Sequence, residues 1–82
     1  MKVFVVAEII QCPTSDVAYN VIGVCTTLEK ARDKMIKCHN DYSSIVQPKD
    51  KIIDDTLCLI IYDCFGVEER HFVIIEEKEV ED

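Results

Sequence analysis

The feature that most constrains the fold is a single stretch with helical spacing, set between segments rich in β-branched residues. From residue 28 onward, apolar side chains recur at steps of three and four, at Leu28, Ala31, Met35, Cys38 and Tyr42. This spacing puts them on one face of an amphipathic helix. The preceding run Thr26-Thr27-Leu28-Glu29 has the form of a capping box. The pattern predicts a helix over residues 27–42 that buries one apolar face.

Four further segments have the β-branched and aromatic content of strands. They span about residues 2–10, 17–25, 56–65 and 70–77. Turn residues around Pro13 separate the first two, and Gly66 begins the turn between the last two. Residues 43–55 contain Pro48 and are predicted to form a connector. The expected fold is therefore one ββαββ domain of the α+β class, covering residues 1–82.

The first and third predicted strands are apolar at nearly every position, which places them in the middle of a sheet. Setting them side by side gives the strand order 2-1-3-4, antiparallel throughout, with the helix on one face. An alternative order, 3-4-1-2, pairs the first and fourth strands in parallel.

Both faces of this sheet are expected to be apolar, but a single helix can cover only one of them. The sequence does not establish which face that is. The second face is covered either by the connector, through Ile45, Val46, Ile52 and Ile53, or by another protein. We expect a homodimer joined through the face opposite the helix. The candidate apolar interface consists of Phe4, Val6, Ile10, Cys58, Ile60 and Tyr62.

The charge of the chain is unevenly distributed. Residues 1–50 hold six basic and six acidic residues, so the second part carries the whole net charge of −7. Phosphates repel such a surface, which argues against direct binding of nucleic acid and favours a basic protein partner. The tail, residues 76–82, is mostly acidic. The candidate acidic docking surface consists of Glu68, Glu69, Glu76, Glu77, Glu79, Glu81 and Asp82.

The apolar runs and the cysteines both indicate a cytoplasmic protein. The longest apolar runs have strand length, whereas a membrane-spanning helix needs about 20 residues. Five cysteines are present, an odd number, and no C-x-x-C pair occurs. This usage favours reduced thiols over a disulfide framework.

No motif for catalysis or cofactor binding is recognisable. The chain lacks G-x-S-x-G, H-E-x-x-H and glycine-rich phosphate-binding motifs, and it has only two glycines. His39 is expected near the helix end, where it suits the helix dipole, and His71 is expected to be a surface imidazole. Cys38-His39 lacks further metal ligands at a plausible spacing. The sequence therefore predicts no enzyme, no metal and no cofactor.

Two runs carry a resemblance. Met1-Lys2-Val3-Phe4-Val5-Val6 and the run from Ile22 to Ala31, IGVCTTLEKA, are similar to a loose group of small bacterial and phage proteins. In that group a strand ending in I-G-V-F-S-S/T leads into a helix that opens with x-E-K-A; here Cys25 replaces the aromatic residue. The resemblance covers roughly the first 40 residues and implies a strand-to-helix joint. In size, charge and lack of an active site the chain also resembles anti-CRISPR inhibitors.

Together these features predict a non-catalytic protein-binding module. The specific hypothesis is a phage-encoded inhibitor that binds a host nucleic-acid-handling or defence protein stoichiometrically. The alternative is a small regulatory or ligand-sensing domain, with its ligand held between helix and sheet near Met35, His39 and Tyr42.

Overall fold

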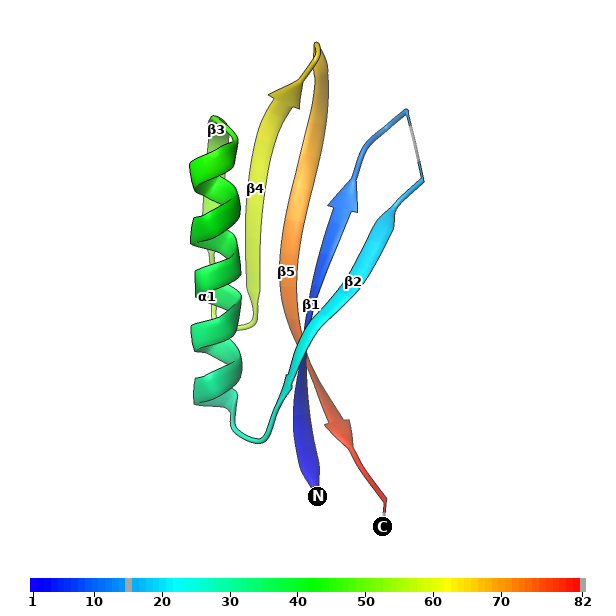
Figure 1. Cartoon of the computed structure of the whole chain (residues 1–82), viewed down its shortest axis with the longest axis vertical. Helices are drawn as coiled ribbons and strands as arrows, with labels where there is room; N and C mark the ends of the chain where they lie inside the picture. The colour runs from blue at the N-terminus through cyan, green and yellow to red at the C-terminus, as the bar shows by residue number, and fades with distance from the viewer. Residues whose placement is uncertain (15, 82) are drawn as a thin grey trace.

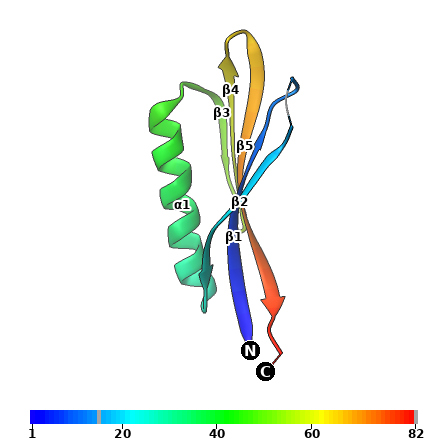
Figure 2. The same cartoon turned by 45° about the vertical axis from the view of Figure 1, so that its right-hand side comes forward.

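Five strands and one helix make up the part of the chain that the structure, a computed structural model, describes, namely residues 1–14 and 16–81. Their order is β1 (Lys2–Gln11), β2 (Ala18–Cys25), α1 (Leu28–Ile45), β3 (Pro48–Ile53), β4 (Leu57–Cys64) and β5 (Val67–Glu79). The strands form one antiparallel sheet in the order β2-β1-β5-β4-β3, and α1 lies along one side of it (Figures 1 and 2). The predicted α+β class, with one helix and an antiparallel sheet, is confirmed.

The predicted four-stranded order 2-1-3-4 is wrong, because the supposed connector contains a fifth strand, β3. This extra strand reverses the direction of every strand after it. The last strand therefore lies beside β1, as in the alternative order, but runs antiparallel to it. Pro48 and three successive charged residues hid β3 in the sequence. Proline at the first position and charges along the strand are compatible with its place at the sheet edge.

The β4–β5 turn is tighter than expected. It is made by Phe65 and Gly66, which both have positive φ, at 50° and 82°. Glycine adopts this conformation freely. β5 therefore starts at Val67, three residues before the predicted boundary, and continues to Glu79 through most of the predicted acidic tail.

Helix α1 begins one residue later than the capping box suggested. The cap is Thr27, whose hydroxyl accepts a hydrogen bond from the Lys30 amide at 3.2 Å. With a lysine at that position, the reciprocal glutamate contact of a capping box is replaced by a simple cap. The helix continues to Ile45, and the Val46 amide closes its last turn on the Tyr42 carbonyl. His39 is thus inside the helix rather than at its end.

The core lies between α1 and one face of the sheet, called here the covered face. Val6, Cys25, Ala31, Met35, Cys58 and Val73 form its buried cluster. The candidate apolar interface lies on this same face: Val6, Cys58 and Ile60 are fully buried, and Tyr62 nearly so. Phe4 packs against the cluster, and Ile10 is paired with buried His71, so it points the same way. Placing these residues opposite the helix was therefore wrong.

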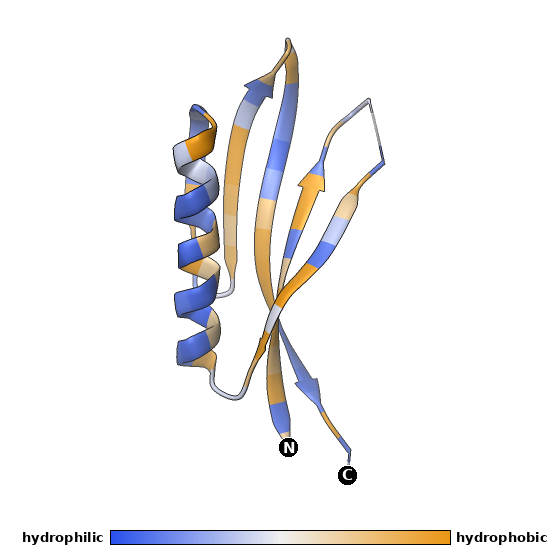
Figure 3. Ribbon diagram, viewed as in Figure 1, coloured by the Kyte–Doolittle hydropathy of each residue, from blue (hydrophilic) through white to orange (hydrophobic). Residues whose placement is uncertain are grey.

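The opposite side of the sheet, called here the open face, is not covered by any described element (Figure 2). β3 joins the sheet edge instead of crossing this face, so the connector does not cover it. Apolar residues run through the middle of β1, β4 and β5, as the orange ribbon in Figure 3 shows. The face that the helix leaves open is therefore the opposite of the one that carries the candidate apolar interface.

Candidate functional site

Polar side chains gather on the covered face, beneath the second half of α1. His39 and Tyr42 come from α1, Tyr62 from β4 and His71 from β5. His39 and His71 are both fully buried. The expectation of a surface imidazole at residue 71 was wrong. His71 lies two residues before Val73 on β5, so both side chains point to the side of the strand that faces the helix. The layer that should be the driest therefore contains several groups that can carry charge or donate hydrogen bonds.

Two side chains, His71 and Cys38, converge on the carboxylate of Glu8. Glu8 Oε2 lies 3.0 Å from His71 Nε2 and 3.7 Å from the Cys38 thiol, which donates to it. A carboxylate only accepts, so His71 carries its hydrogen on Nε2. The ligand atoms of Glu8, Cys38 and His71 all lie within 4.8 Å of one another. Residues from β1, α1 and β5 thus meet at a single point.

A stack and a short hydrogen-bond chain fix the neighbouring rings. The rings of Tyr42 and His71 are parallel to within 6°, with centroids 3.8 Å apart. Tyr62 donates to Glu69 at 2.6 Å, so its oxygen accepts from Tyr42 at 2.7 Å. Burial, and then the hydrogen bond to Glu69, raise the pKa of Tyr62. These two hydrogen bonds hold Tyr42, and through it the stacked imidazole of His71, in one orientation.

His39 differs from these partnered groups. Within the described residues, neither of its ring nitrogens has a hydrogen-bond partner, and the same holds for Nδ1 of His71. Burial, and then the positive charge of Lys51, lower the pKa of His39. His39 is therefore held as a neutral ring in the core, where an unsatisfied polar group is costly.

The chemistry of Cys38 does not favour nucleophilic catalysis. Burial, followed by the negative charge of Glu8, raises the pKa of the Cys38 thiol to about 11. A cysteine nucleophile reacts as the thiolate, and enzymes lower the pKa to obtain it. In the free protein the side chain thus acts as a hydrogen-bond donor at neutral pH.

An open depression of about 370 Å³ gives solvent access to this cluster. Its lining includes Glu8, Cys38, Asp41 and Tyr42, together with the side chains of Lys34 and Lys37. The predicted ligand pocket near Met35, His39 and Tyr42 is only partly matched. Tyr42 lines the depression, whereas Met35 and His39 are closed off in the core.

The acidic docking surface is not brought together. Glu68 and Glu69 lie at one end of β5 and Glu76, Glu77 and Glu79 at the other, in a molecule 48 Å long. Adjacent residues also alternate between the two faces. Glu76, Glu77 and Glu79 form ion pairs with Lys78, Lys2 and the amino terminus. Glu81 is exposed beyond the strand, and Asp82 lies outside the described residues.

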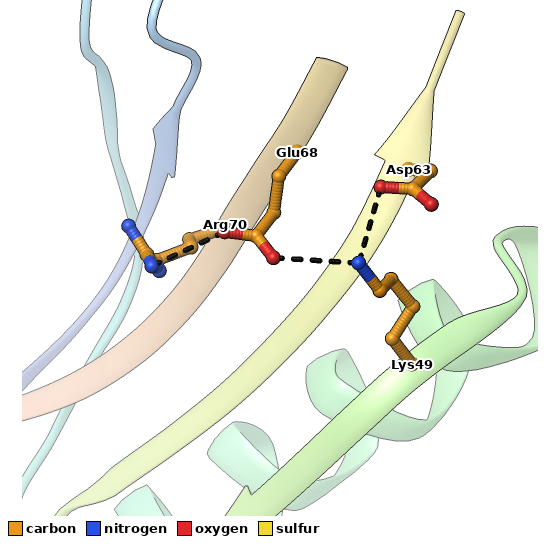
Figure 4. Close-up of polar contacts among 4 residues, drawn as sticks. All are labelled: Lys49, Asp63, Glu68 and Arg70. Carbon is orange, nitrogen blue, oxygen red and sulfur yellow. Dashed lines mark hydrogen bonds and ion pairs between the residues drawn. The ribbon is translucent and has the colours of Figure 1, made fainter. Parts of the chain in front are cut away.

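Glu68 takes part in an ion-pair ladder on the open face (Figure 4). Lys49 of β3 lies 3.5 Å from both Asp63 of β4 and Glu68 of β5, and Arg70 lies 3.3 Å from Glu68. The ladder crosses three strands near the β4–β5 turn. It balances two acids with two bases at one end of the open face.

Between this ladder and the other end of the sheet, the open face is apolar across all five strands. Register pairing aligns one row from edge to edge: Tyr19, Ile9, Phe72, Leu59 and Ile52. A second row contains Val21, Ala7, Ile74 and Leu57. About half of the surface of Tyr19, Val21 and Ile52 is exposed, at 52 %, 55 % and 45 %. The open face is therefore a continuous apolar surface.

No family model, curated protein or solved structure matches the chain. The resemblance of the strand-to-helix joint to small bacterial and phage proteins stays a prediction. In the described part of the chain, α1 lacks the continuous apolar stretch that a membrane-crossing helix requires.

Proposed function

We propose that the chain is a non-catalytic protein-binding module and that the open face is its binding surface. The observation that carries this proposal is the apolar row from Tyr19 to Ile52, which no described element covers. Apolar surface left in water forgoes roughly 25 cal/mol per Å² of possible stabilisation. Continuous apolar patches of this kind mark interaction sites on soluble proteins.

The occupant we assign to this face is a second copy of the chain. The chain has a net charge of −7, yet the paired charges on the open face are balanced: three bases, Lys49, Arg70 and Lys78, lie beside three acids, Asp63, Glu68 and Glu76. Asp50 adds one more acid. A nearly neutral face can pack on its own copy with little repulsion, and a two-fold contact buries the same patch on both.

Pairing through the sheet edge is a weaker route to a dimer. The edge strand β3 carries Lys49, Asp50 and Lys51 in succession, and charged residues on an edge oppose edge-to-edge pairing. The contact is therefore expected face to face, with the apolar rows in the centre and the ion-pair ladder at the periphery.

Sedimentation velocity at micromolar concentration tests the proposal. The unmodified chain should have about twice the mass of one 9.4-kDa chain. Phe72→Glu puts a charge in the middle of the central row and should give a monomer. Because Phe72 is partly buried, Val21→Glu serves as a second variant at a more exposed position and should weaken the dimer without unfolding it.

Ile45→Glu is the matched control, since Ile45 is 78 % exposed at the end of α1 and lies off the open face. It should keep the dimer mass. A monomeric unmodified chain over the whole concentration range, or a dimer that persists in both open-face variants, would refute a second copy as the occupant.

The inhibitor role is a finer proposal within this function. It is supported by the net charge of −7, which favours a basic partner, and not by a single acidic surface. Its signature is an association with a basic nucleic-acid-binding protein that weakens steeply as salt is added. Binding that is insensitive to salt would argue against it.

A further inference from the structure

We propose that Glu8, Cys38 and His71 form a binding site for a divalent cation of the Zn²⁺ type. The three residues lie far apart in the sequence and on three different elements, β1, α1 and β5. The fold nevertheless brings one oxygen, one sulfur and one nitrogen within 4.8 Å of one another. This mixed donor set is the one that zinc takes in proteins.

The spacing of the donor atoms suits a tetrahedral ion. Zinc bonds of about 2.0–2.3 Å separate neighbouring ligand atoms by roughly 3.3–3.6 Å. The oxygen and nitrogen of Glu8 and His71 are 3.0 Å apart, and the oxygen and sulfur of Glu8 and Cys38 are 3.7 Å apart. These two pairs need to change by only a few tenths of an ångström to match a tetrahedral ion, and the third pair, the His71 nitrogen and the Cys38 sulfur, lies within 4.8 Å.

The surroundings resemble a site that is already arranged. His71 is fully buried and stacked on Tyr42, whose hydroxyl is fixed in turn by Tyr62. A ligand whose orientation is fixed in this way loses little freedom when it binds a metal. The depression beside Glu8 and Cys38 leads in from solvent, which gives the ion an entry path and leaves a fourth position for water or an external ligand.

The charges and protons also balance. Binding replaces the thiol proton of Cys38, which leaves as H⁺, and shifts the ring hydrogen of His71 from Nε2 to Nδ1. The resulting thiolate and the Glu8 carboxylate together neutralise the two charges of the ion. The other charged groups that line the depression are one acid, Asp41, and two bases, Lys34 and Lys37. The Asp41 carboxylate lies 3.9 Å from Lys37 Nζ.

Titration of the full chain with Co²⁺ tests the site, because thiolate-bound Co²⁺ absorbs in the near ultraviolet and tetrahedral Co²⁺ absorbs intensely in the visible. We expect both signals to saturate at one ion per chain and one equivalent of Zn²⁺ to abolish them. Cys38→Ser should remove the thiolate band. Glu8→Gln should weaken binding by more than about 100-fold, since even outer-shell changes at metal sites cost 10–100-fold.

Cys12→Ser is the matched control: it makes the same chemical change in the β1–β2 loop, away from the cluster, and should keep the full spectrum. His71→Gln is a second test if Cys38→Ser folds poorly, and it should also abolish the visible bands. Absence of a thiolate band at excess Co²⁺, or a band that survives Cys38→Ser, would overturn the proposal and leave a hydrogen-bonded cluster. All three ligands belong to one chain and lie off the open face, so the result does not depend on the dimer.

Discussion

The two faces of this sheet are built from alternate residues of the same strands, yet they differ in an unexpected way. The layer between the covered face and the helix, which is shielded from water, contains a polar cluster of two histidines, a glutamate, a cysteine and two tyrosines, three of them from the strands and three from α1. The open face, which water reaches, is apolar in its centre and carries its charges at its ends. The usual distribution, with apolar residues inside and polar residues outside, holds for neither face completely.

This difference indicates that each face serves more than the stability of the isolated chain. A buried polar cluster stabilises little compared with apolar packing of the same volume, so its presence suggests a specific use. An exposed apolar face stabilises nothing until something covers it. The metal site and the dimer are the two uses proposed here.

The largest effect is expected from a matched pair of neighbouring substitutions on β1. Val6→Lys would place an unpaired charge beneath α1, where Val6 is fully buried. That costs several kcal/mol, about 3–5, and should unfold most of the chain. Val5→Lys points to the open face beside Glu76 and should fold as a monomer. Circular dichroism with urea titration and sedimentation velocity would measure the two outcomes.

The comparison of the faces fails if the two lysine variants behave alike. Two folded variants would mean that the helix does not seal the covered face. Two unfolded variants would mean that the open face is as intolerant of charge as the core.

A smaller effect, of opposite sign, is expected at His39. His39→Leu keeps a similar volume and removes two buried nitrogens without partners, so it should stabilise the chain by about 1–3 kcal/mol at pH 7.5. Because folding lowers the pKa of His39 from 6.5, the unfolded chain binds a proton at this residue more readily than the folded chain does. No such penalty exists well above pH 6.5, and the folded chain loses stability as the pH falls below 6.5. The gain from His39→Leu should therefore grow between pH 6.5 and pH 5.

Urea titrations at two pH values and a fixed chain concentration would measure this gain, since the proposed dimer would make stability depend on concentration. Asn40→Ala, an exposed neighbour on the same helix, should show no such pH dependence. A loss of stability in His39→Leu at pH 7.5 would mean that the histidine nitrogens make a hydrogen bond worth keeping.

The smallest effect is expected from the ladder at the end of the open face. Lys49→Met removes contacts to Asp63 and Glu68 that are half exposed, so the stability of the single chain should change by less than about 1 kcal/mol. The open face, however, gains a net negative charge on both copies. The dimer should weaken a few-fold at low salt and recover at high salt.

Lys37→Met makes the same change in net charge on α1, off the open face, where the side chain of Lys37 is 80 % exposed. Its dimer dissociation constant should stay close to that of the unmodified chain. If Lys49→Met and Lys37→Met weakened the dimer equally, the effect would be assigned to the total charge of the chain rather than to the charge of the open face.

Much of the fold could be predicted from local patterns. Helical spacing located α1 to within a few residues, and β-branched runs located four strands. The fifth strand could not be found in this way, because Lys49-Asp50-Lys51 lacks the apolar content on which strand prediction depends. Missing one strand changed the direction of every later strand, so a local omission became an error in topology.

The site could be predicted less well, because it is assembled from residues distant in sequence. The available signal was the alternation of residues along each strand. Glu8 interrupts the alternate apolar positions Phe4, Val6 and Ile10, and His71 lies two residues from apolar Val73, on the same face of its strand. A polar residue at an apolar position on two strands is informative only once those strands are known to be neighbours. The pairing of β1 with β5 was the missing fact, and without it Cys38 seemed to have no companions.

That same pairing has a consequence for how the chain reaches its fold. The contacts between β1 and β5 join residues 59 to 77 positions apart, from Gln11–Arg70 to Lys2–Glu79. Closing a loop of that length costs about 2 kcal/mol more than closing a short hairpin, and folds dominated by such distant contacts form slowly. During synthesis, β1 can pair with β2 early, but its other edge waits until residues 67–79 have been added. For that interval the apolar edge of a two-stranded ribbon is available to other nascent chains, so the synthesis of β5 is the step that ends this risk of aggregation.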